Sequence, residues 1–449
     1  MRRTSRPLMC AVLLLAPSVV AADDAALLER IQQLEARVAD LEQERSERPA
    51  PAAFDANAPS AGVSSWSDRV QISGSTSTGY FAGPQDSIFA GDAFRVWDAR
   101  LFVDADLGRN VGLGGTELVR DIGLSMEWNL VRLGYLTNDV GELYVDLQGI
   151  ANDDWLSLQV GRFQLPVGEA YLRRSRGEDD NPFVTHSVAG AWWWNNGVRF
   201  YGGSPDGDVG YVGSVTNAVT AFTDNNNQGQ QFSLKLFANP TPWLHLSVSG
   251  LRSGQMGSSA GPASGSLWLG ETWAMPVGNG TTLPTFTNGV VVPQAPNELS
   301  NSLFFCGDAI VTIPDAMRLW LSFGRYAMRS AGPGLYDRDL DAWIAELILQ
   351  GELLSPALRP FYLALRASGL GTYDDEKGYL LDARLAARFG YDTSSLDAYS
   401  VAAGWRITQR VTLRAEYTLE QFGLVRGART VIPGSLVDNL FALTVGVHF

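Results

Sequence analysis

Lysine, histidine and cysteine are scarce in this sequence. Only two of the 34 basic residues are lysines, Lys235 and Lys377, and the chain has 3 histidines and 2 cysteines. The 48 acidic residues leave a net charge of −14, which argues against a nucleic-acid partner. Because no histidine or cysteine lies in a recognisable nucleophile or metal-binding motif, the sequence predicts no enzyme and no cofactor.

Long apolar runs are also missing. After residue 21 no window approaches the roughly 20 apolar residues that a membrane helix needs. The short run at residues 8–16 follows three arginines and precedes the small residues Val19 and Ala21, as in a signal peptide. We therefore expect residues 1–21 to be removed on export, which leaves Cys306 without a disulfide partner.

Residues 22–45 have the heptad pattern of a short coiled-coil helix. Arginines and glutamates flank the apolar seam where parallel chains can form ion pairs, so the segment predicts an oligomer, and its β-branched residues nominally favour a dimer. A single amphipathic helix is the alternative, because fewer than three heptads are marginal. Residues 46–67 are rich in Pro, Ala and Ser and are expected to be a linker. The apolar seam of the expected helix at residues 22–45 consists of Leu27, Ile31, Leu34, Val38 and Leu41.

From residue 68 to residue 449 short alternating runs are separated by clusters of Gly, Asn, Asp and Pro, which indicates an all-β domain. One soluble β-sandwich takes about 100 residues, whereas this pattern continues without an internal boundary. At roughly 20 to 25 residues for a strand and its connection, the domain predicts a transmembrane antiparallel β-barrel of about sixteen strands. Lipid outside and water inside then explain the two faces of the last strand: Phe441, Leu443, Val445 and Val447 alternate with Ala442, Thr444, Gly446 and His448.

Aromatic residues near the expected strand ends fit the girdles that barrels place at both membrane interfaces. The alternative for the tryptophan run is a buried aromatic cluster under a loop. The girdle set is Tyr80, Phe81, Trp192 to Trp194, Tyr362, Tyr399 and Trp405.

The chain ends in Phe449 after strict alternation. This ending looks like the C-terminal insertion signal of bacterial outer-membrane barrels. The resemblance implies recognition by the barrel assembly machinery.

Residues 152–203 resemble the corresponding region of the phosphate-selective porin O and P family. Members show a strand that ends in Gly-Arg-Phe, a proline soon after it, a loop, and tryptophans before a Gly-Val strand. The matching residues here are Gly161, Arg162, Phe163, Pro166, Trp192 to Trp194, Gly197 and Val198. The resemblance implies a trimer of sixteen-stranded barrels in which inward-folded loops narrow each pore. Phosphate capture in that family is associated with arginine ladders and lysine clusters, and this chain has only two lysines.

Charged residues on the polar phase of the strands predict the lining of the pore, and their mixed signs predict weak ion selectivity. The loop that carries Arg173, Arg174 and Arg176 is expected to fold into the lumen, with a solvated external loop as the alternative. Arg366 and Arg384 would extend a basic strip that favours anions. The predicted lining set is Asp98, Arg100, Asp104, Glu142, Asp146, Arg414 and Glu416.

The sequence thus predicts an outer-membrane porin for passive diffusion of small hydrophilic solutes or ions, with anions such as phosphate among the candidates and the N-terminal segment in the periplasm. The expected partners are outer-membrane lipid and further copies of the chain. A structural barrel that tethers or sheathes periplasmic partners is the alternative. His245, Ser247 and Ser249 have the residue types of an outer-membrane phospholipase, but alternation makes them lumen-facing strand residues more simply.

Overall fold

The computed structural model describes residues 69–84, 91–113, 116–132, 134–173, 181–192, 194–217, 230–253, 299–330, 338–372, 393–424 and 437–449, with short strand pieces between residues 268 and 297. The predicted signal peptide (1–21), coiled-coil helix (22–45) and linker (46–67) lie outside the described residues. Among the described residues, no helix has the length and apolar character to cross a membrane.

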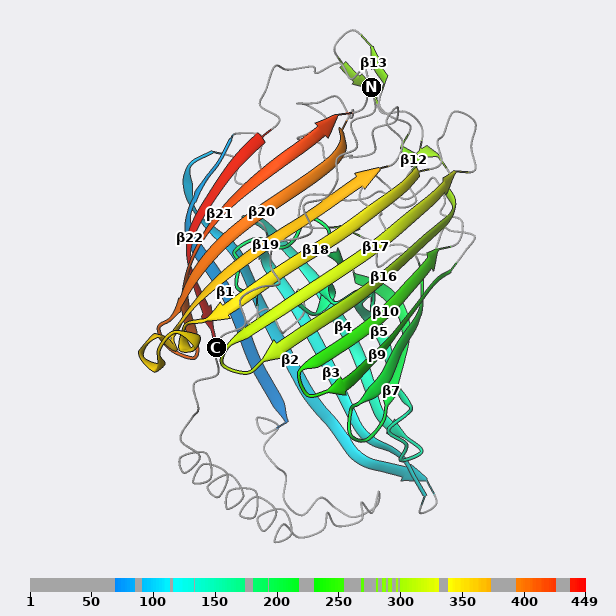
Figure 1. Cartoon of the computed structure of the whole chain (residues 1–449). Helices are drawn as coiled ribbons and strands as arrows, with labels where there is room; N and C mark the ends of the chain where they lie inside the picture. The colour runs from blue at the N-terminus through cyan, green and yellow to red at the C-terminus, as the bar shows by residue number, and fades with distance from the viewer. Residues whose placement is uncertain are drawn as a thin grey trace. The chain divides into compact units, whose positions relative to one another are not determined.

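Sixteen strands form one closed antiparallel barrel (Figure 1), so the predicted all-β barrel and its strand number are confirmed. The first and last strands close it, with Ser75 paired to His448. Closure pairs every backbone edge, which a barrel in lipid requires. The strands are β1 (Val70–Ala82), β2 (Ala93–Leu113), β3 (Thr116–Arg132), β4 (Tyr135–Ile150), β5 (Ser157–Gln164), β7 (Trp194–Gly203), β8 (Val209–Thr216), β9 (Gln231–Thr241), β10 (Leu244–Ser253), β16 (Leu299–Ile313), β17 (Met317–Ser330), β18 (Arg338–Gln350), β19 (Phe361–Thr372), β20 (Thr393–Arg406), β21 (Val411–Leu424) and β22 (Val437–His448).

The described parts of the connections contain two-stranded pairs and 3-10 helices. The connections after β2, β7, β9, β16 and β20 are short, whereas β5 to β7, β10 to β16 and β19 to β20 are joined by long ones at the other end of the barrel. Outer-membrane barrels have this asymmetry between periplasmic turns and extracellular loops. The small elements are β6 (Ala191–Trp192) with β11 (Trp268–Leu269), β12 (Gly280–Thr281) with β15 (Pro296–Asn297), β13 (Thr285–Thr287) with β14 (Val290–Val292), η2 (Ala170–Arg173), η4 (Gly351–Leu353) and η5 (Pro356–Leu358).

The two faces of the wall have opposite character. On β22, Phe441 and Leu443 are 39% and 41% exposed, while the alternate residues Ala442 and Thr444 are 0% and 1% exposed. Strand β9 repeats the pattern, because Leu234 and its apolar neighbours point outward and the intervening polar residues are buried. The outward face is thus an apolar band that a bilayer would cover.

A β-bulge changes the phase of β2 near its loop end. The register between β1 and β2 shifts between Ser77 and Thr78, and a one-residue shift turns a side chain to the opposite face. Trp97 therefore does not lie on the outer face with Leu101, where simple alternation places it. Its ring is buried and stacks on Phe81 with centroids 4.9 Å apart.

The girdle prediction is wrong for several aromatics. Phe81, Trp192, Trp194 and Tyr362 are buried inside the barrel, because a long connection folds in and covers them. The buried-cluster alternative is correct for Trp192 and Trp194, and Trp193 lies outside the described residues. Tyr399 and Trp405 do project outward and are 44% and 41% exposed.

Candidate functional site

The connection between β5 and β7 folds into the barrel, and we call residues 165–193 the pore loop. Residues 165–173 and 181–192 of the loop are described, and Leu165, Val167 and Phe183 in them are fully buried. Leu165 and Val167 pack against an apolar stretch of the inner wall, although alternation makes this strand face polar elsewhere, and Phe183 packs in a separate cluster with Ile348, Tyr362, Ala364 and Ala402. The wall side of the contact with Leu165 and Val167 comprises Phe304, Ile310, Trp320, Tyr326, Leu340, Ile344, Leu370, Leu396 and Phe422 on β16 to β21.

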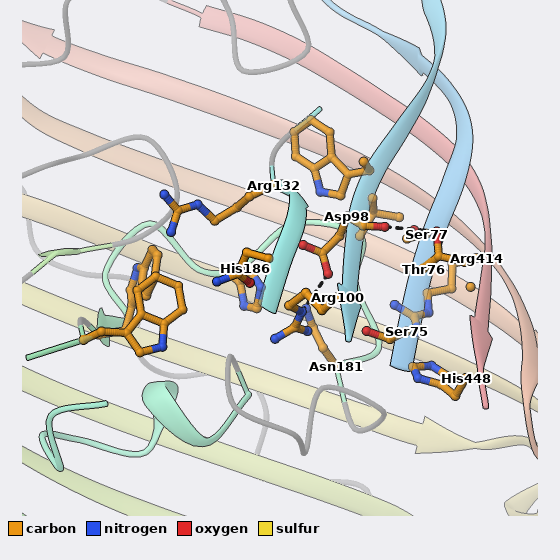
Figure 2. Close-up of a pocket in the computed structure, with 16 residues that line it drawn as sticks. Ser75, Thr76, Ser77, Asp98, Arg100, Arg132, Asn181, His186, Arg414 and His448 are labelled. Atoms are coloured by element: carbon orange, nitrogen blue, oxygen red, sulfur yellow. Dashed lines mark hydrogen bonds and ion pairs between the residues drawn. The ribbon is translucent and has the colours of Figure 1, made fainter. Parts of the chain in front are cut away.

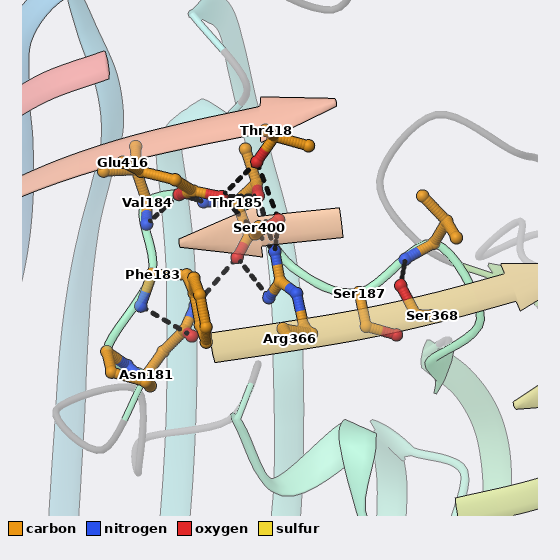
Figure 3. A network of polar contacts seen from close by, with 12 residues as sticks. Asn181, Phe183, Val184, Thr185, Ser187, Arg366, Ser368, Ser400, Glu416 and Thr418 are labelled. Carbon is orange, nitrogen blue, oxygen red and sulfur yellow. Dashed lines mark hydrogen bonds and ion pairs between the residues drawn. The ribbon is translucent and has the colours of Figure 1, made fainter. Parts of the chain in front are cut away.

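Polar residues of β19 to β21 bind the tip of the pore loop (Figure 3), and we call this the Thr185 contact. The carboxylate of Glu416 accepts hydrogen bonds from the backbone N–H of Val184 at 2.6 Å and of Thr185 at 2.8 Å. Arg366 donates to the carbonyl of Thr185 at 2.9 Å and lies 3.4 Å from Glu416. All of these groups are buried, so the carboxylate and the guanidinium bind the backbone of Thr185 through its N–H and its carbonyl.

Neighbouring wall residues extend the Thr185 contact along the loop. The hydroxyl of Tyr362 donates to the carbonyl of Pro182 at 2.9 Å. The guanidinium of Arg366 lies 4.1 Å from the ring centroid of Phe183, a cation–π geometry. The segment around Thr185 therefore has a fixed position against the wall.

A second cluster binds the beginning of the loop to β9 and β10, and we call it the Glu169 contact. The carboxylate of Glu169 lies 2.7 Å from the Lys235 ammonium, 2.8 Å from His245 Nε2 and 2.6 Å from the Ser247 hydroxyl. Burial opposes the charged carboxylate, but the hydrogen bond from His245 and the charge of Lys235 prevail and lower the pKa of Glu169 to about 2. The shift corresponds to about 3 kcal/mol in favour of the bound loop, present above pH 4.5 and lost only as the pH falls through 2.

Directly after the loop, the first residue of β7, Trp194, is bound to β3. Its indole N–H donates to Glu127 at 3.2 Å, and Glu127 also pairs with Arg100 at 3.2 Å. Arg132 lies 5.2 Å from the ring centroid of Trp194. The loop and the strand residue that follows it thus contact the wall at three separated places, each of which contains a buried carboxylate.

We expect Gly141→Ala to disrupt this third contact. A Cβ at Gly141 on β4 would overlap the carboxylate of Glu127, which is fully buried and held by Arg100 and Trp194. Overpacking of this kind costs roughly 1–3 kcal/mol, so the midpoint of urea unfolding in detergent should fall. Gly123→Ala is the control, because the nearest atom to its Cβ would be 3.8 Å away. Equal midpoints for the two variants would contradict the packing described.

An open space remains between the loop and the wall formed by β1 to β3, β21 and β22 (Figure 2). It is a cavity of about 720 Å³, a volume that includes space open to solvent. Arg100, Arg132 and Arg414 line it, with Asp98 as the acidic lining residue. Arg100 is paired with Asp98 at 2.9 Å and with Glu127 at 3.2 Å, whereas Arg132 has a longer ion pair, 3.8 Å from Asp139, so Arg132 and Arg414 supply most of the positive potential.

No protein-family model matches the chain, and no curated protein sequence matches it. Solved structures do match. The anion-selective porin from Comamonas acidovorans has a TM-score of 0.52 and 10% identity over 85% of this chain and 99% of that chain. The outer membrane channel DcaP of Acinetobacter baumannii has a TM-score of 0.53 and 10% identity over 85% and 97%. OmpT of Vibrio cholerae in its trimer form has a TM-score of 0.52 and 11% identity over 85% and 99%. The barrel has the porin fold.

Within this porin fold the predicted lining residues fall into different places. Asp98, Arg100 and Arg414 line the cavity. Asp104 accepts from Ser125 at 2.8 Å, Asp146 accepts from Tyr201 at 2.9 Å, and Glu142 accepts from the backbone of Gln164 at 3.2 Å. Arg366 and Glu416 bind the pore loop. Arg173 is described only in its backbone, in η2, and Arg174, Arg176 and Arg384 lie outside the described residues.

Sequence alternation missed other residues of the porin lumen. Glu127 alternates with the same period as Ser125 and Asn129 on β3, so the pattern of that strand could have predicted that Glu127 faces the lumen. Arg132 lies at the last position of β3, where alternation carries little information, and it reaches the cavity beside Trp194. Glu169 belongs to the pore loop, whose path no local pattern predicts.

Proposed function

We propose that the protein is an outer-membrane porin that allows small hydrophilic solutes to diffuse passively, with a preference for anions. The observation that carries the proposal is the cavity beside the pore loop, lined by Arg132 and Arg414 inside a closed barrel. A passive channel needs a wet path with charged side chains at its narrow part, and such charges set which ions enter.

The membrane location is supported by the outer face of the wall. Val248, Phe305 and Phe323 are 60%, 57% and 57% exposed on three different strands, and hydrocarbon would cover them. In this orientation the short connections face the periplasm and the long ones face outward. The last residue, Phe449, pairs through its backbone with Gly74 at the short-connection end, where its aromatic side chain is accessible to assembly machinery.

The finer assignment is an oxyanion path of the kind found in the phosphate-selective porin O and P family, in a trimer. The Gly161-Arg162-Phe163 resemblance and the cavity arginines Arg132 and Arg414 support it. OmpT in its trimer form has the same fold, which supports the trimer. The sheath alternative needs a wide lumen, and the packed pore loop argues against it.

Reversal potential in a salt gradient tests the function. Purified protein in planar bilayers should give an ohmic current whose reversal potential has the sign of anion preference, because Arg100, Arg132 and Arg414 outweigh the charge of Asp98 around the cavity. Competition by phosphate against chloride then tests the finer assignment. A barrel without current, or a clear cation preference, would overturn the proposal.

A further inference from the structure

Aromatic rings hold the guanidinium of Arg132, whereas carboxylates hold that of Arg100 in the same cavity. Arg132 lies 5.2 Å from the ring centroid of Trp194 and 5.9 Å from that of Trp192, a cation–π geometry with both rings. Arg100 is paired with two carboxylates instead. A carboxylate cancels the charge of the cation that it holds, but an aromatic ring carries no net charge. Arg132 therefore keeps its positive charge at the edge of the cavity (Figure 2).

Trp192 and Trp194, which we call the tryptophan pair, have fixed positions. Their ring centroids are 5.0 Å apart and their planes meet at 87°. They are 2% and 3% exposed and belong to the apolar cluster between the pore loop and the wall. The indole N–H of Trp194 donates to Glu127, and the backbone of Trp192 pairs with that of Trp268 in β11. The pair is thus a rigid support for the side chain of Arg132.

A carboxylate competes with the tryptophan pair for Arg132. Asp139 on β4 lies 3.8 Å from the guanidinium, and its side chain is 42% exposed. An ion pair of this length at an exposed site is weak, because water screens it. Without the ring contacts the guanidinium could move closer to Asp139, and a closer pair would cancel its charge. The rings therefore favour the position of Arg132 in which its charge is available to the cavity.

We infer that Trp192 is a positioning residue that keeps the charge of Arg132 available to anions. The inference rests on the proposed porin function, because its consequence is an ion preference. Trp192 belongs to the pore loop and Arg132 to β3, so the bound loop completes the positive side of the cavity. The loop then contributes to ion preference through an uncharged side chain, as well as narrowing the lumen.

Reversal potentials of the full-length protein in planar bilayers test this role. Trp192→Leu removes one ring without altering any formal charge, and the anion-to-cation permeability ratio should fall roughly two- to fivefold, the factor that one cation–π contact corresponds to. Trp192→Phe keeps an aromatic ring and should remain close to the native ratio. Phe304→Leu is the matched control, because it removes another buried ring of the same apolar cluster outside the cavity, and it should keep the native ratio.

Removal of the competing carboxylate distinguishes positioning from packing. In chains that already carry Asp139→Asn, the further change Trp192→Leu should leave the permeability ratio as it is in Asp139→Asn alone, because no nearby carboxylate remains to neutralise Arg132. A residue that acts only through packing would have the same effect in both backgrounds. An equal fall in the two backgrounds, or a native ratio in Trp192→Leu, would overturn the inference.

Proton NMR of arginine-labelled protein in detergent gives a readout that does not depend on current. The side-chain protons of Arg132 should resonate at high field in the native chain because of the ring currents of the two indoles, and Arg132→Gln identifies the resonance by its loss. The resonance should move toward its ordinary position in Trp192→Leu. Absence of a high-field resonance in the native chain would overturn the inference. Absence of current in the native chain would overturn the porin function instead, and the NMR result would still decide whether the rings hold Arg132.

Discussion

Replacing Glu416 by alanine should release the tip of the pore loop and produce a larger, noisier single-channel current. The carboxylate binds two backbone N–H groups of the loop and pairs with Arg366 inside the barrel. Removal of one partner from a buried ion pair costs roughly 3–5 kcal/mol, because the other charge stays buried. The population of released loop should therefore rise roughly a hundred- to several thousandfold.

The size of the effect should depend on how much of the carboxylate each substitution removes. Glu416→Gln keeps one oxygen acceptor of nearly the same shape, so its current should be intermediate. Tyr417→Phe is the matched control, because Tyr417 is the next residue of β21 and its hydroxyl donates to Asn439 on the outer face. If Glu416→Ala gave the native conductance and the native noise, the pore loop would not be held by this contact.

Charge reversal at the cavity should invert the ion preference. Arg132→Glu combined with Arg414→Glu changes the formal charge of the three lining arginines and Asp98 from +2 to −2, since each replacement alters the charge by two. The local concentration of permeant ions follows the sign of this potential, which a closed wall of low dielectric focuses into the lumen. The reversal potential in a salt gradient should change from the anion side to the cation side.

Two further variants separate a local effect from net charge. Arg132→Gln with Arg414→Gln should give a channel with little preference, which keeps the test valid if the glutamate pair disturbs folding. Arg109→Glu with Arg359→Glu alters the total charge as much as the glutamate pair does, at exposed sites outside the cavity, and should leave the preference unchanged. If the reversal potential shifted equally in the cavity double variant and in the exposed double variant, the ion preference would not come from the cavity.

The wall of the barrel followed from the sequence because a strand between lipid and water must alternate with a period of two. On β21, Leu413, Tyr417 and Glu416 take the faces that alternation assigns to them. The strand number followed from chain length in the same way, because the bilayer sets how many residues a crossing needs. Trp97 shows the limit of the method, since one extra residue at a bulge reverses the phase.

The roles of the lumen-facing charged residues did not follow from the alternation of side chains along the strands. Arg366 and Arg414 share the same kind of lumen-facing position on β19 and β21, yet Arg366 binds the backbone of the pore loop and Arg414 lines the cavity. Their phase is identical, and only the path of a loop distant in sequence distinguishes them. The same reason explains Trp192 and Trp194, which have the composition of a membrane girdle but lie inside the wall.

The sequence alone determined the closed all-β architecture, its apolar outside and its polar inside, because these depend on a repeat of neighbouring residues and on the solvent that each face meets. Only the tertiary structure decided where residues 165–173 and 181–192 lie, which carboxylates hold them and on which side the lumen stays open. Those features depend on contacts between residues far apart in the chain, such as Thr185 with Glu416, and no local periodicity records such contacts.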